Sequence, residues 1–579
     1  MTPLLQINNL SIDFITESGN TSALKNITFE INRGETVAIV GESGSGKTVC
    51  SLSILQLLPS PPAQFTSGEI LFSEKGQQPI DLLKLPEYKI REIRGNKIAM
   101  IFQEPMTSLN PVKTCGSQVI EAIRIHQNIT HKEGELKCIK LFEQVQLPDP
   151  EGMLKRYPHQ ISGGQKQRVM IAMAMSCEPS LLIADEPTTA LDVTVQKTIL
   201  KLIKDLQVSH NMSVIYITHD LGLVAEIADK VIVMYRGDVV ETGNIKDIFL
   251  RPQHPYTKAL LSCRPAPDSK GKRLPVIDDF LSGKISSDNI SFKETLLKKE
   301  SQQLPDSKID HSSSPLLKVE NLKVFFPIKK NFFGKTILEF KAVNDVSFTV
   351  QKGETVGLVG ESGCGKTTLG RSIIRLIEPT SGNIYFNNKN IAHIPDEELR
   401  KMRKEIQIIF QDPYGSLNPR LTIGQAINEP MKVHQILPTE KQRKEKIVDL
   451  LEKVDLKPEF FNRYPHEFSG GQRQRICIAR ALSLNPDFII CDESVSALDV
   501  SVQAQVLNLL NDLKEELGFT SIFISHDLGV VHYISDRIMV MHNGRIEEEG
   551  TADEIFYHPK KEYTQQLIAS IPKTGRIQA

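Results

Sequence analysis

The chain has few of the features that mark a secreted, metal-stabilised or membrane-spanning protein. Its 579 residues include eight cysteines, but these are scattered and form no C-x-x-C pair, so neither a disulfide framework nor a zinc or iron–sulfur site is expected. No apolar run approaches the roughly 18 residues needed to span a bilayer. The first residues, MTPLLQINNLSIDF, lack the basic segment and apolar stretch of a signal peptide. These absences predict a soluble cytosolic protein, for which any membrane role would have to come through a partner.

An excess of charge of one sign is also missing. The formal net charge is -1 and the pI is near 6.9, so the chain lacks the basic surplus of a nucleic-acid-binding protein, and no nucleic-acid partner is expected. A hydrophobic content of 40% is enough to build sizeable cores. The length predicts several folding units rather than one.

The most informative feature that is present is an internal repeat. Residues 24–48 (LKNITFEINRGETVAIVGESGSGKT) recur at 343–367 as VNDVSFTVQKGETVGLVGESGCGKT, and residues 156–175 recur at 463–482. A repeat of this length is a domain duplication. Residues 271–315, between the copies, are rich in Ser, Lys and Asp and poor in aromatics, which is typical of a solvated linker. The sequence therefore predicts a first domain at 1–270, a polar linker at 271–315 and a second domain at 316–579.

Within each half, short apolar runs rich in β-branched residues alternate with helix-like stretches. In the first half the runs are residues 36–40, 181–185, 213–218 and 230–235, and residues 195–208 carry apolar side chains at helical spacing. Continuous apolar strands interleaved with helices favour a mainly parallel sheet that is covered on both faces. The expected fold class is α/β.

Two glycine-rich segments have the spacing of a phosphate-binding loop. Residues 41–48 (GESGSGKT) and 360–367 (GESGCGKT) fit G-x-x-x-x-G-K-[ST], and each follows an apolar strand and precedes a helix-like stretch. Glycines let backbone N–H groups surround phosphates, lysine adds a point charge, and the threonine hydroxyl ligates Mg²⁺. We therefore expect Mg²⁺ as cofactor and ATP bound by Gly41, Glu42, Ser43, Gly44, Ser45, Gly46, Lys47, Thr48, Gly360, Glu361, Ser362, Gly363, Cys364, Gly365, Lys366 and Thr367.

An acidic pair ends an apolar strand in each half. The sequences LLIADE and FIICDE place Asp185 beside Glu186 and Asp492 beside Glu493. An Asp at a strand end suits Mg²⁺ binding, and the following Glu can orient or deprotonate the attacking water. In isolation such a pair is more often a solvated strand end, but its position downstream of a phosphate-binding loop favours hydrolysis.

A histidine and a glutamine recur around these pairs. His219 and His526 each follow a strand and could reach a γ-phosphate, although a lone histidine there would usually be a loop residue with ordinary hydrogen bonds. Gln103 and Gln411 each follow the dipeptide IF, where an isolated glutamine would usually be a surface hydrogen-bonding residue.

The segment S-G-G-Q at 162–165 and 469–472 resembles the signature motif of the ABC ATPases, and the other motifs stand in that family's order in both halves. The resemblance implies two P-loop NTPase domains of the ABC type in tandem, each with an antiparallel β subdomain and a helical subdomain. The helical subdomain should lie between Gln103 and the signature in the first half, and after Gln411 in the second.

The resemblance also implies residue roles. The implied catalytic residues are Glu186, Glu493, His219, His526, Gln103 and Gln411. The implied Mg²⁺ ligands are Thr48, Gln103, Asp185, Thr367, Gln411 and Asp492. The implied signature residues, which close over ATP held by the opposite cassette, are Ser162, Gly163, Gly164, Gln165, Ser469, Gly470, Gly471 and Gln472. Residues 190–192 and 497–499 resemble the D-loops that join the two sites. Phe14 and Phe326 are candidates for stacking on adenine, with core strand residues as the equal alternative.

Both halves keep the whole motif set, so neither site looks degenerate. The one departure is Ser494, where the first half has Pro187, and it leaves the catalytic groups in place. The two cassettes are expected to pair within one chain, with Lys47 facing Ser469 and Lys366 facing Ser162.

The C-terminal ends of the two halves resemble one particular group of ABC ATPases. Residues 254–265 (HPYTKALLSCRP) and 561–572 (KEYTQQLIASIP) resemble the C-terminal extension of the oligopeptide/dipeptide importer ATPases, as do residues 102–111 and 410–420. This implies the motor of an importer for peptides, glutathione or peptide antibiotics. The implied partners are integral-membrane permease subunits and an external substrate-binding protein, and the implied location is the cytoplasmic face of the inner membrane. Many single-cassette relatives carry an iron–sulfur cysteine cluster after this extension, and only Cys263 is nearby here.

The alternative function is that of a soluble ABC ATPase. Translation-factor members join two cassettes by a long charged helical arm, and DNA-repair members insert zinc-binding C-x-x-C modules. The serine-rich, nearly neutral linker and the absence of C-x-x-C pairs favour the importer motor.

The phosphate-binding loops differ at one position. The second has Cys364 where the first has Ser45. A thiol beside a helix N-terminus and Lys366 is expected to have a lowered pKa and to react with maleimides, although a tolerated small residue without a regulatory role is the simpler interpretation.

Overall fold

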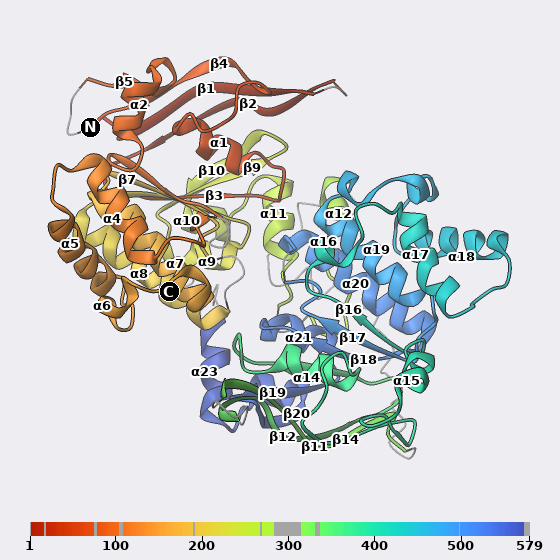
Figure 1. The fold of residues 1–579 in the computed structure, drawn as a ribbon. Helices are drawn as coiled ribbons and strands as arrows, with labels where there is room; N and C mark the ends of the chain where they lie inside the picture. Colours follow the sequence, from red (N-terminus) through yellow and green to blue (C-terminus); the bar gives the residue numbers. More distant parts are fainter. Residues whose placement is uncertain are drawn as a thin grey trace.

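The computed structural model describes residues 2–16, 19–74, 78–103, 108–188, 192–266, 269–282, 314–330, 336–496 and 498–571. Figure 1 shows two lobes of similar architecture, one for each half of the chain. Most of the predicted linker, together with Ala190, Leu191 and Ala497 of the predicted D-loops, lies outside the described residues.

The first lobe contains two sheets. A four-stranded antiparallel sheet has the order β2-β1-β4-β5, formed by Gly19–Ile31, Leu5–Thr16, Ala63–Phe72 and Ile80–Asp81. A six-stranded sheet has the order β10-β9-β3-β8-β7-β6, formed by Asp238–Asn244, Lys230–Tyr235, Thr36–Val40, Ser213–Thr218, Leu181–Asp185 and Ile98–Ile101. Only β10 runs antiparallel to its neighbour in this sheet. The strands predicted from apolar runs are confirmed, because full burial on both faces demands unbroken apolar sequence.

The second lobe repeats this arrangement. Its antiparallel sheet has the order β12-β11-β14-β15, formed by Thr336–Val350, Leu317–Lys330, Ser381–Phe386 and Lys389–Asn390. Its mixed sheet has the order β16-β17-β18-β13-β19-β20, formed by Ile406–Ile409, Phe488–Asp492, Thr520–Ile524, Thr355–Val359, Arg537–His542 and Arg545–Thr551. The predicted α/β fold class with two cassettes in tandem is thus confirmed.

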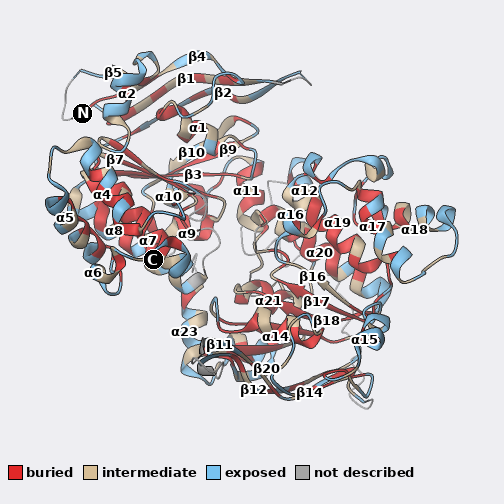
Figure 2. Cartoon of the chain, viewed as in Figure 1, coloured by how far each residue is buried: buried red, intermediate tan, exposed pale blue. Residues whose placement is uncertain are grey.

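A helical subdomain lies between the expected glutamine and the signature in each lobe. In the first lobe it contains α4 (Cys115–His126), α5 (His131–Gln144) and α6 (Pro150–Met153), and α7 (Gly163–Ala174) starts at the signature. In the second it contains α16 (Pro413–Ser416), α17 (Ile423–Val433) and α18 (Glu440–Lys453), followed by α19 (Gly470–Leu482). Figure 2 shows buried positions along the strands and along α7, α19 and α20 (Val500–Leu517), with more exposed positions on α5 and α18.

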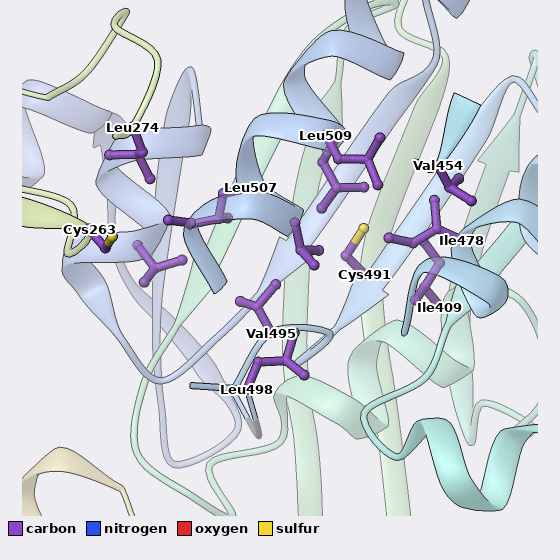
Figure 3. Close-up of a cluster of buried hydrophobic side chains, with 14 of the residues drawn as sticks. Cys263, Leu274, Ile409, Val454, Ile478, Cys491, Val495, Leu498, Leu507 and Leu509 are labelled. Atoms are coloured by element: carbon purple, nitrogen blue, oxygen red, sulfur yellow. The ribbon is translucent and has the colours of Figure 1, made fainter. Parts of the chain in front are cut away.

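The apolar cores do not stop at the boundary between the halves. The largest cluster contains core residues of the second lobe together with side chains of α11 (Pro255–Ser262), α12 (Ile277–Leu281) and the segment between them. Figure 3 shows Cys263 and Leu274 of this first-half extension near Leu507 of α20. In the other direction, α23 (Glu562–Ser570) contacts α8 (Val193–His210), and Lys197 Nζ lies 3.3 Å from the carbonyl oxygen of Ala569. Each C-terminal extension therefore reaches the opposite lobe.

Among the residues that the structure describes, no helix is both long enough and apolar enough to cross a bilayer.

Candidate nucleotide-binding and hydrolytic sites

Each phosphate-binding loop connects a central strand to a helix. In the first lobe β3 ends at Val40 and α1 (Lys47–Ile54) starts inside the loop. Gly41 has φ 154°, and a Cβ placed on it would lie 2.2 Å from the carbonyl oxygen of Met234. The second loop repeats this geometry between β13 and α14 (Lys366–Ile373), since a Cβ on Gly360 would lie 2.2 Å from the carbonyl oxygen of Met541. Glycine is therefore required by close backbone contact at the start of both loops.

The loop lysines are buried and are held by backbone carbonyls. Lys47 Nζ donates to the carbonyl oxygens of Gly41 and Glu42, both at 2.8 Å, and Lys366 Nζ donates to the equivalent residues at the same distances. Burial lowers the pKa of Lys47, and the surrounding carboxylates act in the opposite direction. The ammonium group is thereby positioned where the loop turns, as phosphate binding requires.

A carboxylate at the end of a strand lies beside the threonine hydroxyl of each loop. Thr48 Oγ1 is 3.4 Å from Asp185 Oδ1, and Thr367 Oγ1 is 2.9 Å from Asp492 Oδ1. Burial raises the pKa of Asp185 to about 6, and burial also raises the pKa of Asp492. In both aspartates burial thus disfavours the ionised carboxylate, and the surrounding protein groups do not fully offset this cost.

The predicted catalytic glutamate, histidine and glutamine come together in both lobes. Gln103 Nε2 donates to Glu186 Oε2 at 3.1 Å, and His219 Nδ1 lies 3.2 Å from Glu186 Oε1. In the second lobe Gln411 Nε2 donates to Glu493 Oε2 at 2.7 Å, with His526 Nδ1 at 3.8 Å. The parallel strand order brings these residues to one sheet edge.

The two glutamates share an unusual backbone conformation. Glu186 has φ 45° and Glu493 has φ 47°, in the left-handed region that few residues with a Cβ adopt. Such strain persists only where the surrounding structure enforces it, and it clusters at functional sites. Its occurrence at the same residue of both lobes follows from the duplication, as it does at Asn9 and Asn321 or at Arg236 and Asn543.

The protonation of the histidine and the glutamate in these clusters is set by burial and by the neighbouring charged groups. Burial alone would lower the pKa of His219, but the hydrogen bond to Glu186 and the nearby Asp499 carboxylate raise it overall. Burial alone would raise the pKa of Glu493, but its contact with His526 lowers it overall. The second glutamate is therefore held in the ionised form that can accept a proton from water.

The signature serines begin the helices that follow them. Ser162 Oγ accepts from the N–H of Gln165 at 3.3 Å, and Ser469 Oγ accepts from the N–H of Gln472 at 3.4 Å. In each case the glutamine side chain accepts from the serine N–H, which completes a capping box at the start of α7 and α19. Both serines are exposed, and their contact with ATP in the opposite cassette stays a prediction.

The first phosphate-binding loop contacts the predicted D-loop region of the second half. The N–H of Ser43 donates to Asp499 Oδ2 at 2.9 Å, and the Ser501 hydroxyl donates to Glu42 Oε1. Asp499 Oδ1 also lies 3.9 Å from His219 Nδ1. A carboxylate of one half thus reaches both the loop and the histidine of the other.

Two tyrosines that sequence reasoning missed also contact the phosphate-binding loops. The N–H of Glu42 donates to the hydroxyl of Tyr256 at 3.0 Å, and the N–H of Glu361 donates to the hydroxyl of Tyr563 at 3.0 Å. Tyr256 is fully buried. The signal was available, because the tyrosines occupy the same place in the repeated segments HPYT and KEYT.

The expectation of a lowered pKa for Cys364 is wrong. Its thiol lies 3.8 Å from Lys366 Nζ, which favours the thiolate, but the side chain is buried and burial raises the pKa overall. Desolvation therefore outweighs the ammonium group. The structure provides no activated thiol at this position.

The candidates for adenine stacking differ in their surroundings. Phe14 packs partly buried against the core of the first lobe, and Phe326 on β11 is 39% exposed. Phe326 is thus the more exposed of the two, and both assignments stay predictions.

Comparison with known proteins adds to this geometry. The sequence profile described as "ABC transporter" matches residues 24–189 and 343–496. The profile described as "Oligopeptide/dipeptide transporter, C-terminal region" matches residues 240–281 and 548–578. The second profile therefore covers the extension of each half, including the tyrosine that contacts each phosphate-binding loop.

Curated relatives resemble the chain over nearly its whole length. The "Glutathione import ATP-binding protein GsiA" of Escherichia coli (strain K12) is 48% identical over 576 residues, covering 98% of this chain and 89% of the relative. The protein of the same name from Salmonella typhimurium (strain LT2) is 47% identical over 573 residues, with the same coverage of both chains.

Proposed function

Because the chain belongs to the ABC transporter family, we propose that it is the ATP-hydrolysing subunit of a membrane importer for peptides or peptide-like compounds such as glutathione. The observation that carries the proposal is that an oligopeptide/dipeptide transporter region follows each of two cassettes. The relatives are named for glutathione import, which supports a small peptide as cargo. Neither comparison favours the alternative of a soluble ABC ATPase in translation or DNA repair.

Hydrolysis can be assigned to the clusters described above. The loop N–H groups and Lys47 would bind the phosphates of ATP, and Glu186 would accept a proton from the attacking water or orient it. His219, which lies beside this carboxylate, would hold it in place and donate toward the γ-phosphate. Gln103 contacts the other carboxylate oxygen and would position the water. The second lobe offers the same set of groups around Glu493.

The residues around each threonine fit a magnesium ion. Asp492 Oδ2 is buried and accepts no hydrogen bond, with Arg371 Nη2 3.6 Å away, so a bound cation would satisfy it. Hydroxyl and carboxylate oxygens are the ligands that Mg²⁺ prefers, together with phosphate oxygens. Thr48, Asp185 and Gln103 would hold the ion in the first site, and their equivalents Thr367, Asp492 and Gln411 in the second. When bound, Mg²⁺ would neutralise charge on the ATP phosphates.

The two cassettes would form composite sites within one chain. The bond between Ser43 and Asp499 supports this pairing, because it brings the second half against the first phosphate-binding loop. In the pairing that we propose, ATP on Lys47 is closed by Ser469, and ATP on Lys366 is closed by Ser162. Each site then needs both halves, and hydrolysis would release them from one another.

An importer ATPase works as a peripheral subunit on a membrane partner. We expect permease subunits and an external substrate-binding protein as partners, at the cytoplasmic face of the inner membrane. Co-purification of the tagged chain with a hydrophobic protein, rather than with ribosomes or DNA, would support this assignment.

Uptake measurements test the function directly. A deletion strain is expected to lose uptake of labelled glutathione or short peptides, and the parental gene should restore it. A gene carrying both Glu186→Gln and Glu493→Gln is the matched control, because the protein should still assemble with its partners without turning over ATP. Normal uptake of these compounds in the deletion strain, together with defective uptake of a sugar or a metal, would contradict the proposed cargo.

A further inference from the structure

One arginine of the first-half extension faces carboxylates of both halves. Arg264 follows α11 in the first-half extension, and its Nη1 donates to Asp220 Oδ1 at 2.9 Å. Its Nη2 lies 4.0 Å from Asp527 Oδ2 of the second half. The two carboxylates belong to opposite lobes, and one guanidinium group faces both of them.

These two aspartates occupy equivalent places in the repeat. Asp220 follows His219 and Asp527 follows His526, so each is the chain neighbour of a predicted catalytic histidine. Each also caps a helix: Asp220 Oδ1 accepts from the N–H of residue 222 at 2.7 Å, and Asp527 Oδ1 accepts from the N–H of residue 529 at 2.8 Å. The capping bond fixes the side chain of each aspartate at the start of its helix. A shift of either carboxylate therefore also moves the neighbouring histidine.

The arginine itself is not repeated. When YTKALLSCRP (256–265) is set against YTQQLIASIP (563–572), Ile571 stands opposite Arg264. One guanidinium therefore serves two equivalent carboxylates, which its planar fork of donors allows.

The extension that carries Arg264 is fixed to the second half. The Tyr533 hydroxyl donates to the carbonyl oxygen of Lys272 at 2.9 Å. Leu274 and Asn508 exchange two hydrogen bonds of 2.9 Å, and the Leu274 side chain packs near Leu507 (Figure 3).

The first half lacks this docking surface. At the positions of Asn508 and Tyr533 it has Lys201 and Glu226. These contacts of the extension that carries Arg264 are therefore not repeated on the first half, where α23 contacts α8 through other residues.

We infer that Arg264 is a positioning residue that joins the two histidine loops, which are the loops that carry His219 with Asp220 and His526 with Asp527. Through this bridge, closing one ATP site aligns the histidine of the other. This inference rests on the proposed pairing of the two cassettes. Arg264 contacts neither nucleotide-binding loop in the described structure, and it would act through Asp220 and Asp527 on their neighbouring histidines. The expected consequence is positive cooperativity between the sites, a coupling that disappears when the bridge is removed.

The test compares ATPase rates of the full chain over a range of ATP concentrations. The parent should show a Hill coefficient clearly above 1, and Arg264→Ile, which installs the residue of the second half, should reduce it to about 1. Arg264→Lys should restore part of the cooperativity, because it keeps the charge but loses the fork. Asp527→Asn removes the charge and keeps a good helix cap, so it should act like Arg264→Ile, and the double variant should lose no more than either single one.

A matched control separates positioning from simple adhesion of the halves. Lys270 Nζ lies 3.5 Å from Asp553 Oδ1 on α22 (Ala552–Tyr557), so this ion pair also joins the first-half extension to the second half, without contacting Asp220 or Asp527 directly. Lys270→Ala should leave the Hill coefficient unchanged. An equal loss of cooperativity in Lys270→Ala, or unchanged cooperativity in both Arg264→Ile and Asp527→Asn, would overturn the inference.

The outcome also distinguishes this inference from the proposed pairing. A cooperative parent whose Arg264 variants stay cooperative would refute the role of Arg264 and leave the pairing intact. A parent with a Hill coefficient of 1 would overturn the inference, and the paired substitutions discussed below then decide whether the composite sites exist.

Discussion

At the scale of single residues, each half repeats one constellation with little change. The carboxylates of Glu186 and Glu493 both receive a glutamine amide and lie near a histidine, and both glutamates have a left-handed backbone. Left-handed backbone at equivalent positions is not confined to the site, since Asn9 and Asn321 share it as well. The contacts with the glutamine and the histidine therefore mark these carboxylates as the centre of each cluster.

Replacing both glutamates tests this assignment. The double variant Glu186→Gln, Glu493→Gln should bind ATP with near-parental affinity and lose about 10²–10⁴ in turnover, the usual contribution of a general base. Glutamine keeps the size and one acceptor oxygen but cannot take the proton. Steady-state ATPase assays beside nucleotide-binding measurements provide the comparison, and near-normal turnover would exclude these residues.

Asp185 allows a prediction about pH. Its folded pKa is raised by burial to about 6 from the model-compound value of 3.8, so the folded protein binds this proton more tightly than the unfolded chain does. Stability contributed by the protonated form is therefore lost as pH rises from about 4 to above 6. Asp185→Asn, which stays neutral, should make the nucleotide-free protein more stable by about 1–3 kcal/mol at pH 7.5, while Mg²⁺-dependent ATP hydrolysis at that site is lost.

Thermal unfolding at several pH values checks this expectation. The Tm advantage of Asp185→Asn should shrink below pH 6 and vanish near pH 4. At that pH the side chain at position 185 is neutral in both the folded parent and the folded variant. Asp205→Asn, an exposed residue on α8, is the control and should shift Tm little at any pH. A constant advantage across the whole range would show that the carboxylate charge is not the cause.

At the scale of elements, the C-terminal extensions connect the ATP sites to the rest of the molecule. In each half a tyrosine at the start of α11 or α23 accepts a hydrogen bond from the N–H of the second residue of the phosphate-binding loop. That N–H precedes the part of the loop that surrounds phosphates. The tyrosine hydroxyl therefore holds the start of the phosphate-binding loop in place.

Removing the two hydroxyls should loosen the loops. Tyr256→Phe together with Tyr563→Phe leaves a buried N–H without its acceptor, a loss of about 1–2 kcal/mol per site. We expect KM for ATP to rise several-fold, with a smaller effect on kcat. Tyr385→Phe on β14, in the antiparallel sheet, is the control and should leave both constants unchanged. Parental KM values in the double variant would show that the loops hold their shape unaided.

At the scale of the whole molecule, the two lobes contact each other through several segments. The D-loop region of the second half contacts the first phosphate-binding loop, and each extension packs on the opposite lobe. A tandem chain keeps its two cassettes at high effective concentration. The sites can therefore form without a second copy of the protein.

Paired substitutions test the arrangement of the sites. Lys47→Ala with Ser469→Ala should damage one composite site and leave the other able to bind and close, whereas Lys47→Ala with Ser162→Ala should damage both. The measured ATPase rate should therefore be clearly higher for the first pair. Equal residual activity in the two double variants would contradict the head-to-tail pairing.

The resemblance to ABC ATPases supplied the predicted membership of each catalytic cluster. The sequence by itself determined the repeat, the α/β order and both phosphate-binding loops. These features follow from local pattern: unbroken apolar runs form the buried strands, and glycines are required where backbones approach closely, as at Gly41 and Gly360. The residues that gather around Glu186 all follow strands of one sheet, and the parallel neighbours β6, β7 and β8 of the structure bring them together.

Only the tertiary structure decided which groups meet across elements and how burial changes their chemistry. The motif of Cys364 suggested an activated thiol, but the fold buries it, and desolvation outweighs the neighbouring Lys366. The bonds of Tyr256 to its phosphate-binding loop and of Arg264 to both histidine loops depend on how the extension docks. Docking is set by the packing of side chains distant in sequence, such as Leu274 and Asn508, and no local pattern encodes which of them come into contact.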